Sequence, residues 1–133
     1  LMPEGTIPRG MAFFEPELKG RWGAARLAAQ TGAPVIPIGI WGTEKVWPRN
    51  ARTPNVLAVG HPPTVRVRVG EPVELGGQDP DADTTAIMAA ITDLLPAEAR
   101  TRRVPTPEEL ARSLPPGYQG DPAAELDRRP GSD

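Results

Sequence analysis

Four residues in one short loop near the start of the chain combine charge, a hydroxyl group and a glycine. The stretch PEGTIPRG places Glu4, Gly5 and Thr6 side by side, and Arg9 follows three residues later. Glycine permits a tight backbone path whose exposed amide groups can hold an anion. A threonine hydroxyl and the planar fork of an arginine both suit a phosphate group. The loop is a candidate anion site, with a polar turn after a strand as the alternative reading.

Few other side chains suit catalysis or metal binding. The 133 residues contain no cysteine and one histidine, His61. This inventory argues against a disulfide framework, a thiolate metal site or a histidine-built metal centre. We therefore expect no metal and no cofactor.

The two halves of the chain carry opposite charge. Residues 1–70 hold nine Lys or Arg and four Glu, a net charge of +5, whereas residues 71–133 hold six Arg and thirteen Asp or Glu, a net charge of −7. A basic first half indicates phosphate groups, an anionic lipid surface or nucleic acid as a partner, or an ordinary solvated surface. Nucleic acid is not expected, because no aromatic residues are interleaved with Arg66 and Arg68.

These side chains need a scaffold, and the pattern predicts an α/β fold with a mixed sheet flanked by helices. Leu1 and Met2 read as the end of a strand, and residues 18–31 read as a helix that stops at Gly32. The apolar run 33–42 predicts a buried strand, made irregular by Pro37. Strand, helix and strand in this order predict a parallel βαβ unit.

A second strand and a second helix follow. Val65, Val67 and Val69 alternate with arginines, which predicts a strand with one buried face and one basic face. Residues 79–95 read as a helix capped by Asp81 or Asp83. Its apolar face would consist of Ile87, Ile91, Leu94 and Leu95.

Residues 96–133 are rich in proline and lack the regular apolar pattern of the preceding residues. We expect a first unit over residues 1–95 and an acidic, largely disordered tail over 96–133. Within the tail, Thr106, Pro107 and Glu109 form a capping-box pattern that predicts a short helix over 107–114.

Three sequence blocks carry a resemblance to a known family. They are P-E-G-T at residues 3–6, Lys-Gly at residues 19–20 and V-I-P-I at residues 35–38. With this spacing, residues 1–75 closely resemble the second half of the glycerophospholipid acyltransferase family, of the 1-acylglycerol-3-phosphate acyltransferase type. The nearest variants are actinobacterial members in which a haloacid-dehalogenase-like domain precedes the acyltransferase. The resemblance implies that the fold is the C-terminal part of an acyltransferase domain.

The resemblance also implies a site. Glu4, Gly5, Thr6 and Lys19 would line the binding site for the acceptor phosphate. Ile7 and Pro8 stand where the family has Arg and Ser, so Arg9 is expected to replace the missing motif arginine. The family's catalytic H-x-x-x-x-D motif lies upstream of P-E-G-T and is absent from these residues. Arg66 stands five residues after His61, where the motif needs Asp, so we interpret His61 as a surface residue and expect no catalytic residue in this chain.

The expected activity follows from the family. The intact enzyme would move a fatty acyl group from acyl-coenzyme A or acyl carrier protein to lysophosphatidic acid or a related acceptor, with its base in an upstream segment. The sequence has no secretory signal and no run of about 18 apolar residues. We therefore expect peripheral association with the cytoplasmic face of the plasma membrane. The alternative is a non-catalytic module that binds anionic lipid or a protein partner.

Overall fold

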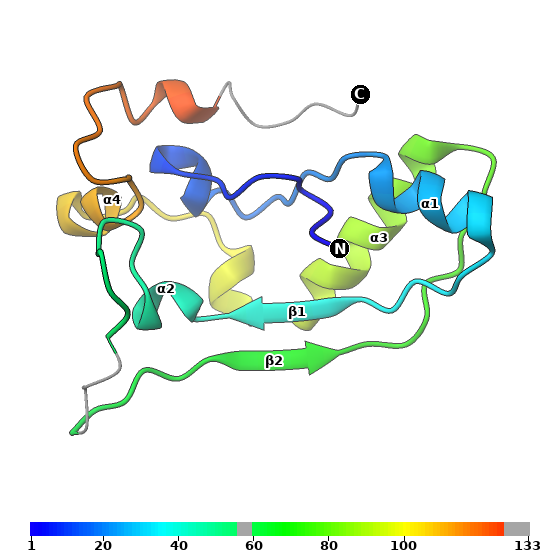
Figure 1. Ribbon diagram of the computed structural model, residues 1–133, viewed down its shortest axis with the longest axis horizontal. Helices are drawn as coiled ribbons and strands as arrows, with labels where there is room; N and C mark the ends of the chain where they lie inside the picture. The colour runs from blue at the N-terminus through cyan, green and yellow to red at the C-terminus, as the bar shows by residue number, and fades with distance from the viewer. Residues whose placement is uncertain (56–59, 127–133) are drawn as a thin grey trace.

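A small antiparallel sheet lies at one side of a mixed α/β fold. The computed structural model describes residues 1–55 and 60–126. Strand β1 (Ile38–Trp41) pairs with β2 (Arg66–Val69), and Ile38 lies opposite Val69 while Ile40 lies opposite Val67 (Figure 1). An isolated antiparallel bridge between Val35 and Val73 extends the pairing beyond the two strands.

The two faces of this sheet differ. Cross-strand partners share a face, so Ile38, Ile40, Val67 and Val69 lie together on what we call the outer sheet face. Their residue exposures are 49%, 51%, 59% and 65%, respectively.

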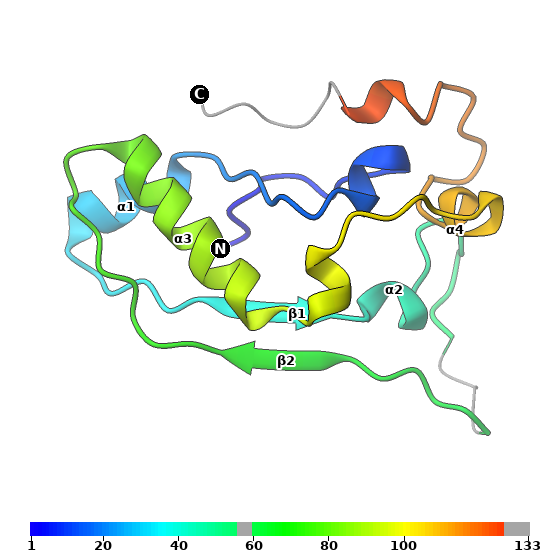
Figure 2. The ribbon, with the colours of Figure 1, turned by 180° about the vertical axis from the view of Figure 1, so that it is seen from behind.

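On the opposite face, helical segments cover β1, whereas Arg66 and Arg68 of β2 are exposed. Figure 2 shows α3 (Pro80–Leu94) running beside the sheet, with its C-terminal end at β1. The Leu94 side chain lies against Gly39, where an added Cβ atom would be only 2.7 Å from Leu94 Cβ. The Trp41 indole N–H donates to Glu98 Oε1 at 2.7 Å, so the short 3-10 helix η2 (Ala97–Arg100) also covers this face.

The residues that cap helices α1 (Gly23–Thr31) and α3 explain where these helices end and begin, respectively. Helix α1 stops where Gly32 turns left-handed, at φ 67°, and donates its N–H to the Ala28 carbonyl. This confirms the predicted stop. Helix α3 begins with Pro80 and is capped by the Asp79 side chain.

The predicted caps of α3 were wrong by two to four residues. The Asp83 side chain instead accepts hydrogen bonds from the Gly76 and Gly77 N–H groups, both at 2.8 Å. The sequence pattern could not identify which acidic residue caps the helix, because Asp79, Asp81 and Asp83 occupy every second position at its start.

The apolar core is small and lies mainly around α1 and α3. The buried apolar residues of the described chain are Ala12, Ala25, Ile87, Met88 and Leu95. Of the predicted face of α3, Ile87 and Leu95 are buried, whereas Ile91 and Leu94 are half-buried. A short helix α2 (Thr43–Val46) follows β1 without contributing a buried residue.

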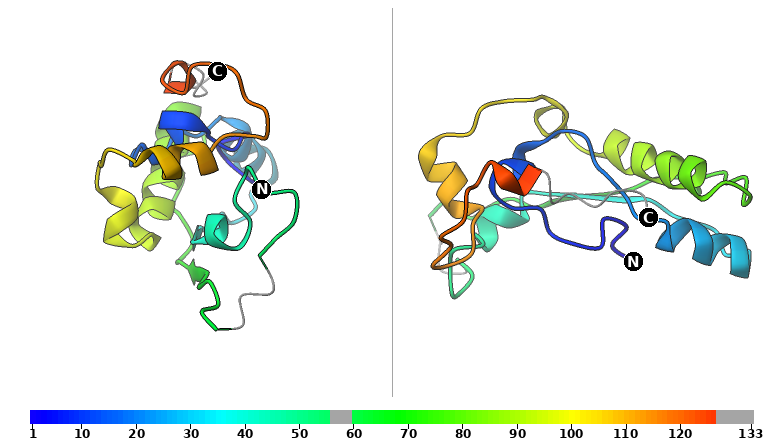
Figure 3. Two further views of the ribbon diagram at one scale, coloured as in Figure 1. Left: turned by 90° about the vertical axis from the view of Figure 1, so that its left-hand side faces the viewer. Right: turned by 90° about the horizontal axis from the view of Figure 1, so that it is seen from above.

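The segment after α3 returns to the N-terminal part of the chain. It contains η2, helix α4 (Pro107–Arg112) and the 3-10 helix η3 (Ala124–Leu126). Figures 1 and 3 show η3, in red, beside the blue 3-10 helix η1 (Gly10–Phe14). The predicted disordered tail therefore does not start at residue 96, although the predicted capping box of α4 is confirmed, and residues 127–133 lie outside the described residues.

Other expectations about strands were also wrong. In the described residues Leu1 and Met2 form no strand, and β1 and β2 are antiparallel, so the predicted parallel βαβ unit and mixed sheet are absent there. The apolar strand faces are exposed rather than buried, because α3 and η2 lie on the other face of the sheet. Of the helices described, none has both the length and the apolar character needed to cross a membrane.

Candidate functional site

The P-E-G-T loop forms a turn at the surface. The Gly5 N–H donates to the Met2 carbonyl at 3.1 Å, and Gly5 has a positive φ of 66°. Residues other than glycine rarely adopt this conformation, so the turn explains the glycine. Gly5 and Thr6 are exposed, whereas Glu4 is half-buried. The Thr6 hydroxyl is thus accessible to a ligand, as the candidate site requires.

Arg21, the residue that follows the Lys-Gly block, lies against this loop. The Arg21 N–H donates to the Pro3 carbonyl at 2.8 Å, which ties the segment before α1 to the turn. The Arg21 side chain crosses Gly5, since its Cδ atom lies 3.0 Å from where a Cβ atom on Gly5 would be. Arg21 and the P-E-G-T turn, which are separate in the sequence, therefore meet in space.

Gly20 fixes this segment on α3. It is buried, and an added Cβ atom would lie 2.8 Å from Met88 Cγ and from Thr84 Cγ2. Its neighbours Lys19 and Arg21 are both exposed. The structure thus places two cations beside a buried glycine, with the Arg21 side chain directed over the P-E-G-T turn.

Arg21 was not among the site residues predicted from the sequence. Its position directly after the Lys-Gly block could have indicated it, but that position also fits a solvated surface charge. Among the residues that the structure describes, the Arg21 guanidinium has no hydrogen-bonding or ionic partner. It is available to an anion.

Arg9, the predicted replacement for the motif arginine, is engaged by the C-terminal segment. Its Nε donates to Glu125 Oε2 at 2.7 Å, and its guanidinium lies 5.4 Å from the centre of the Tyr118 ring. The hydrogen bond to Glu125 is the main cause that raises the pKa of Arg9 above its ordinary value. Arg9 therefore already holds a carboxylate in this structure.

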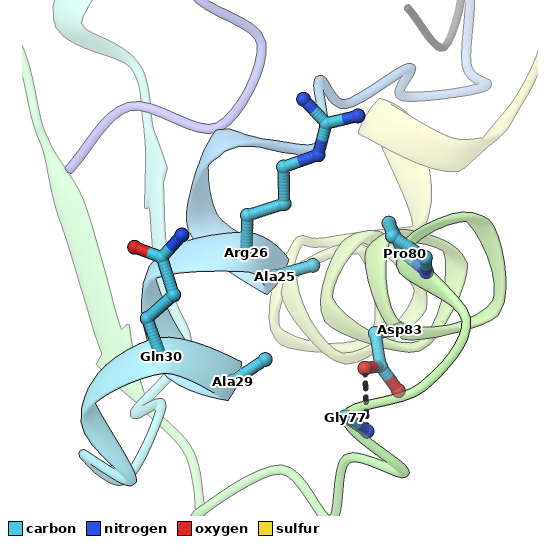
Figure 4. Close-up of a pocket in the computed structure, with 7 residues that line it drawn as sticks. All are labelled: Ala25, Arg26, Ala29, Gln30, Gly77, Pro80 and Asp83. Atoms are coloured by element: carbon cyan, nitrogen blue, oxygen red, sulfur yellow. Dashed lines mark hydrogen bonds between the residues drawn. The ribbon is translucent and has the colours of Figure 1, made fainter.

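A shallow pocket of about 300 Å³ lies elsewhere, between α1 and the start of α3 (Figure 4). The Ala25 and Ala29 methyl groups point toward α3, whereas the Arg26 side chain points away from Asp83. The Asp83 carboxylate is already held by the Gly76 and Gly77 N–H groups. The pocket thus presents small apolar groups and a satisfied carboxylate, which gives it no evident reactive group.

The described residues offer no constellation for metal or acid–base chemistry. No group of three or more His, Cys, Asp or Glu side chains in residues 1–55 and 60–126 is arranged to hold a metal ion. His61 is exposed, as expected for a surface residue. What the site can do chemically is bind an anion, through the Thr6 hydroxyl, the backbone of the turn, and the charges of Lys19 and Arg21.

Comparisons of this chain with protein-family models, with curated proteins and with solved structures found no match.

Proposed function

We propose that this chain is the acceptor-binding part of a glycerophospholipid acyltransferase, and that its P-E-G-T turn binds the phosphate of lysophosphatidic acid or a related acceptor. The observation that carries the proposal is the contact of Arg21, the residue directly after the Lys-Gly block, with the P-E-G-T turn. Arg21 N–H binds the Pro3 carbonyl, and the Arg21 side chain crosses Gly5. A glycine turn, a free hydroxyl and an unpaired guanidinium are then close together, which suits a phosphate monoester.

The fold is compatible with a part of a larger α/β domain. The outer sheet face exposes four branched apolar side chains, as a sheet does when a further layer belongs on it. The acyl donor would be acyl-coenzyme A or acyl carrier protein. The reaction needs a histidine base that these residues do not supply, and the site would work at the cytoplasmic face of the plasma membrane.

Binding to vesicles tests the acceptor site. Phosphatidylcholine vesicles would carry either lysophosphatidic acid, monoacylglycerol or phosphatidylglycerol, and binding would be measured by co-sedimentation. We expect preference for lysophosphatidic acid over both others. Equal binding to phosphatidylglycerol would instead support the alternative, a non-catalytic module for anionic lipid surfaces, and no preference over monoacylglycerol would contradict a phosphate site.

The variant R21A should weaken binding to lysophosphatidic acid vesicles about tenfold, the loss expected for one charge-assisted hydrogen bond. The matched control is R52A, which removes the same charge from an exposed arginine after α2. We expect R52A to change binding less than about twofold, as screened surface charge does. Equal losses in the two variants would show that Arg21 contributes only general positive charge.

Acyl transfer itself is tested on the longest polypeptide encoded together with these residues. We expect transfer from acyl-coenzyme A or acyl carrier protein to lysophosphatidic acid, dependent on an upstream H-x-x-x-x-D histidine acting as general base. An upstream coding sequence without that motif would contradict the proposed acyl transfer. The proposed binding of the acceptor phosphate would then be decided by the vesicle experiment alone.

A further inference from the structure

The contact between Arg9 and the C-terminal segment suggests how the proposed site is controlled. We propose that Glu125 is an internal competitor for the acceptor phosphate: residues 115–126 fold back so that the Glu125 carboxylate occupies Arg9 Nε, and a phosphate headgroup must displace it to bind this nitrogen. The inference rests on the proposed function and adds Arg9, three residues after Thr6, to the groups that would contact the acceptor phosphate once Glu125 is displaced.

Glu125 is held as a bound anion would be. The residue is only 5% exposed although it is charged. One carboxylate oxygen accepts from Arg9 Nε at 2.7 Å, and the other accepts from the Tyr118 hydroxyl at 2.5 Å. Charged residues are rarely buried unless they are paired, so these partners keep the carboxylate in place. The pair joins residues that are 116 positions apart in the chain.

The backbone of the segment also contacts η1. The Met11 N–H donates to the Pro122 carbonyl at 3.0 Å, and Gly10 allows this approach because an added Cβ atom would lie 2.6 Å from Pro122 O. Residues 115–126 include three prolines and two glycines and contribute no buried apolar side chain. A segment with so little apolar burial is expected to open more easily than the core.

A phosphate monoester is a stronger ligand for Arg9 than the carboxylate is. It carries up to two negative charges and three acceptor oxygens, whereas Glu125 brings one charge. The guanidinium fork also has donors beyond Nε, and the contact to Glu125 uses only Nε. Displacement therefore gives up the hydrogen bonds of Glu125 from Arg9 Nε and the Tyr118 hydroxyl, and it gains a contact of the phosphate to Arg9 that can be bidentate.

The test compares binding of the full chain to phosphatidylcholine vesicles that contain lysophosphatidic acid. We expect E125Q to bind about fivefold more tightly than the unchanged chain, because a neutral amide competes poorly for the guanidinium. The matched control is E108Q, which removes the same charge from an exposed residue of α4 that does not contact Arg9. An equal gain in E108Q would overturn the proposal, since net charge would then explain the effect.

A second variant avoids any change of charge. Y118F removes the hydroxyl that holds Glu125 and should also increase affinity, by a smaller factor than E125Q. In the double variant R9A/E125Q the gain should disappear. Unchanged or weaker binding in both E125Q and Y118F would overturn the competitor role. The Arg9–Glu125 pair would then only hold the C-terminal segment in place.

The same data separate this inference from the proposed function. Binding that depends on Arg21 but does not respond to E125Q or Y118F overturns only the competitor role. If neither the unchanged chain nor E125Q prefers lysophosphatidic acid over monoacylglycerol, both proposals fail. Circular dichroism of each variant confirms that the helices are retained.

Discussion

Gly20 lies where the segment before α1 crosses α3, and its missing side chain permits that crossing. A Cβ atom there would be 2.8 Å from Met88 Cγ and Thr84 Cγ2, closer than van der Waals contact allows. We expect G20A to destabilise the fold by about 1–3 kcal/mol, the usual cost of overpacking a filled core. Urea unfolding followed by circular dichroism measures this loss.

The matched control is the same substitution at Gly23. That glycine begins α1, and nothing lies within 4 Å of an added Cβ atom. G23A should be neutral or stabilise by up to about 0.5–1 kcal/mol, because alanine loses less backbone entropy in a helix. A loss of stability in G23A equal to that in G20A would show that packing against α3 is not the cause.

Two arginines of the N-terminal region show what residue type alone cannot decide. From the sequence, Arg9 was assigned to the phosphate, and Arg21 was not included among the site residues. In the structure Arg21 lies over Gly5, whereas Arg9 is paired with Glu125. The partner of Arg9 is set by the return of a proline-rich segment from the far end of the chain. No local pattern encodes that contact.

Helix α4 shows local pattern and structure in agreement. The Thr106 side chain accepts from the Glu109 N–H, and the Glu109 carboxylate accepts from the Thr106 N–H at 2.9 Å. Glu109 also accepts from two nitrogens of Arg103, at 2.7 and 3.0 Å. The capping box was predictable because all its residues lie within one turn, and its signal does not depend on tertiary contacts.

The pH dependence of α4 follows from Glu109. The hydrogen bonds from Arg103, followed by that from the Thr106 backbone, lower its pKa from 4.5 to about 2. A carboxylate with a lowered folded-state pKa stabilises above its unfolded pKa, and this stabilisation is lost as the pH falls through the folded value. We expect the α4 population to be constant above about pH 4.5 and to fall toward pH 2.

Backbone NMR shifts of Leu110 and Ala111 report this transition. The control E109Q has no carboxylate to titrate, so its α4 population should be lower at pH 7 and should show no such fall in this range. A fall of the same size in E109Q would mean that α4 responds to another acidic group.

The strands show the opposite case, in which local pattern was misleading. The apolar run around β1 and the alternating valines of β2 correctly indicated strands, and the alternation correctly placed the arginines on one side of β2. Which face is covered depends on where α3 and η2 pack. The Trp41 contact to Glu98 and the packing of Leu94 on Gly39 decide it, and both are long-range.

At the scale of the whole molecule, the acidic half neutralises part of the basic half. Glu125 pairs with Arg9, and Glu98 lies 3.8 Å from Arg66. Exposed pairs such as Arg66 and Glu98 contribute little stability. Their effect is on binding, since each carboxylate lowers the local positive potential that an anionic lipid would meet.

The outer sheet face leads to the last prediction. Ile38, Ile40, Val67 and Val69 form one contiguous apolar patch, whereas Val104, 88% exposed, lies apart from them. A contiguous patch binds hydrophobic dyes more strongly than a scattered apolar residue does. We expect the chain to enhance the fluorescence of anilinonaphthalene sulfonate, I40T/V67K to abolish most of this enhancement, and V104K to leave it unchanged. An equal loss in V104K would mean that the dye binds elsewhere, and the sheet face would then not be the principal apolar surface.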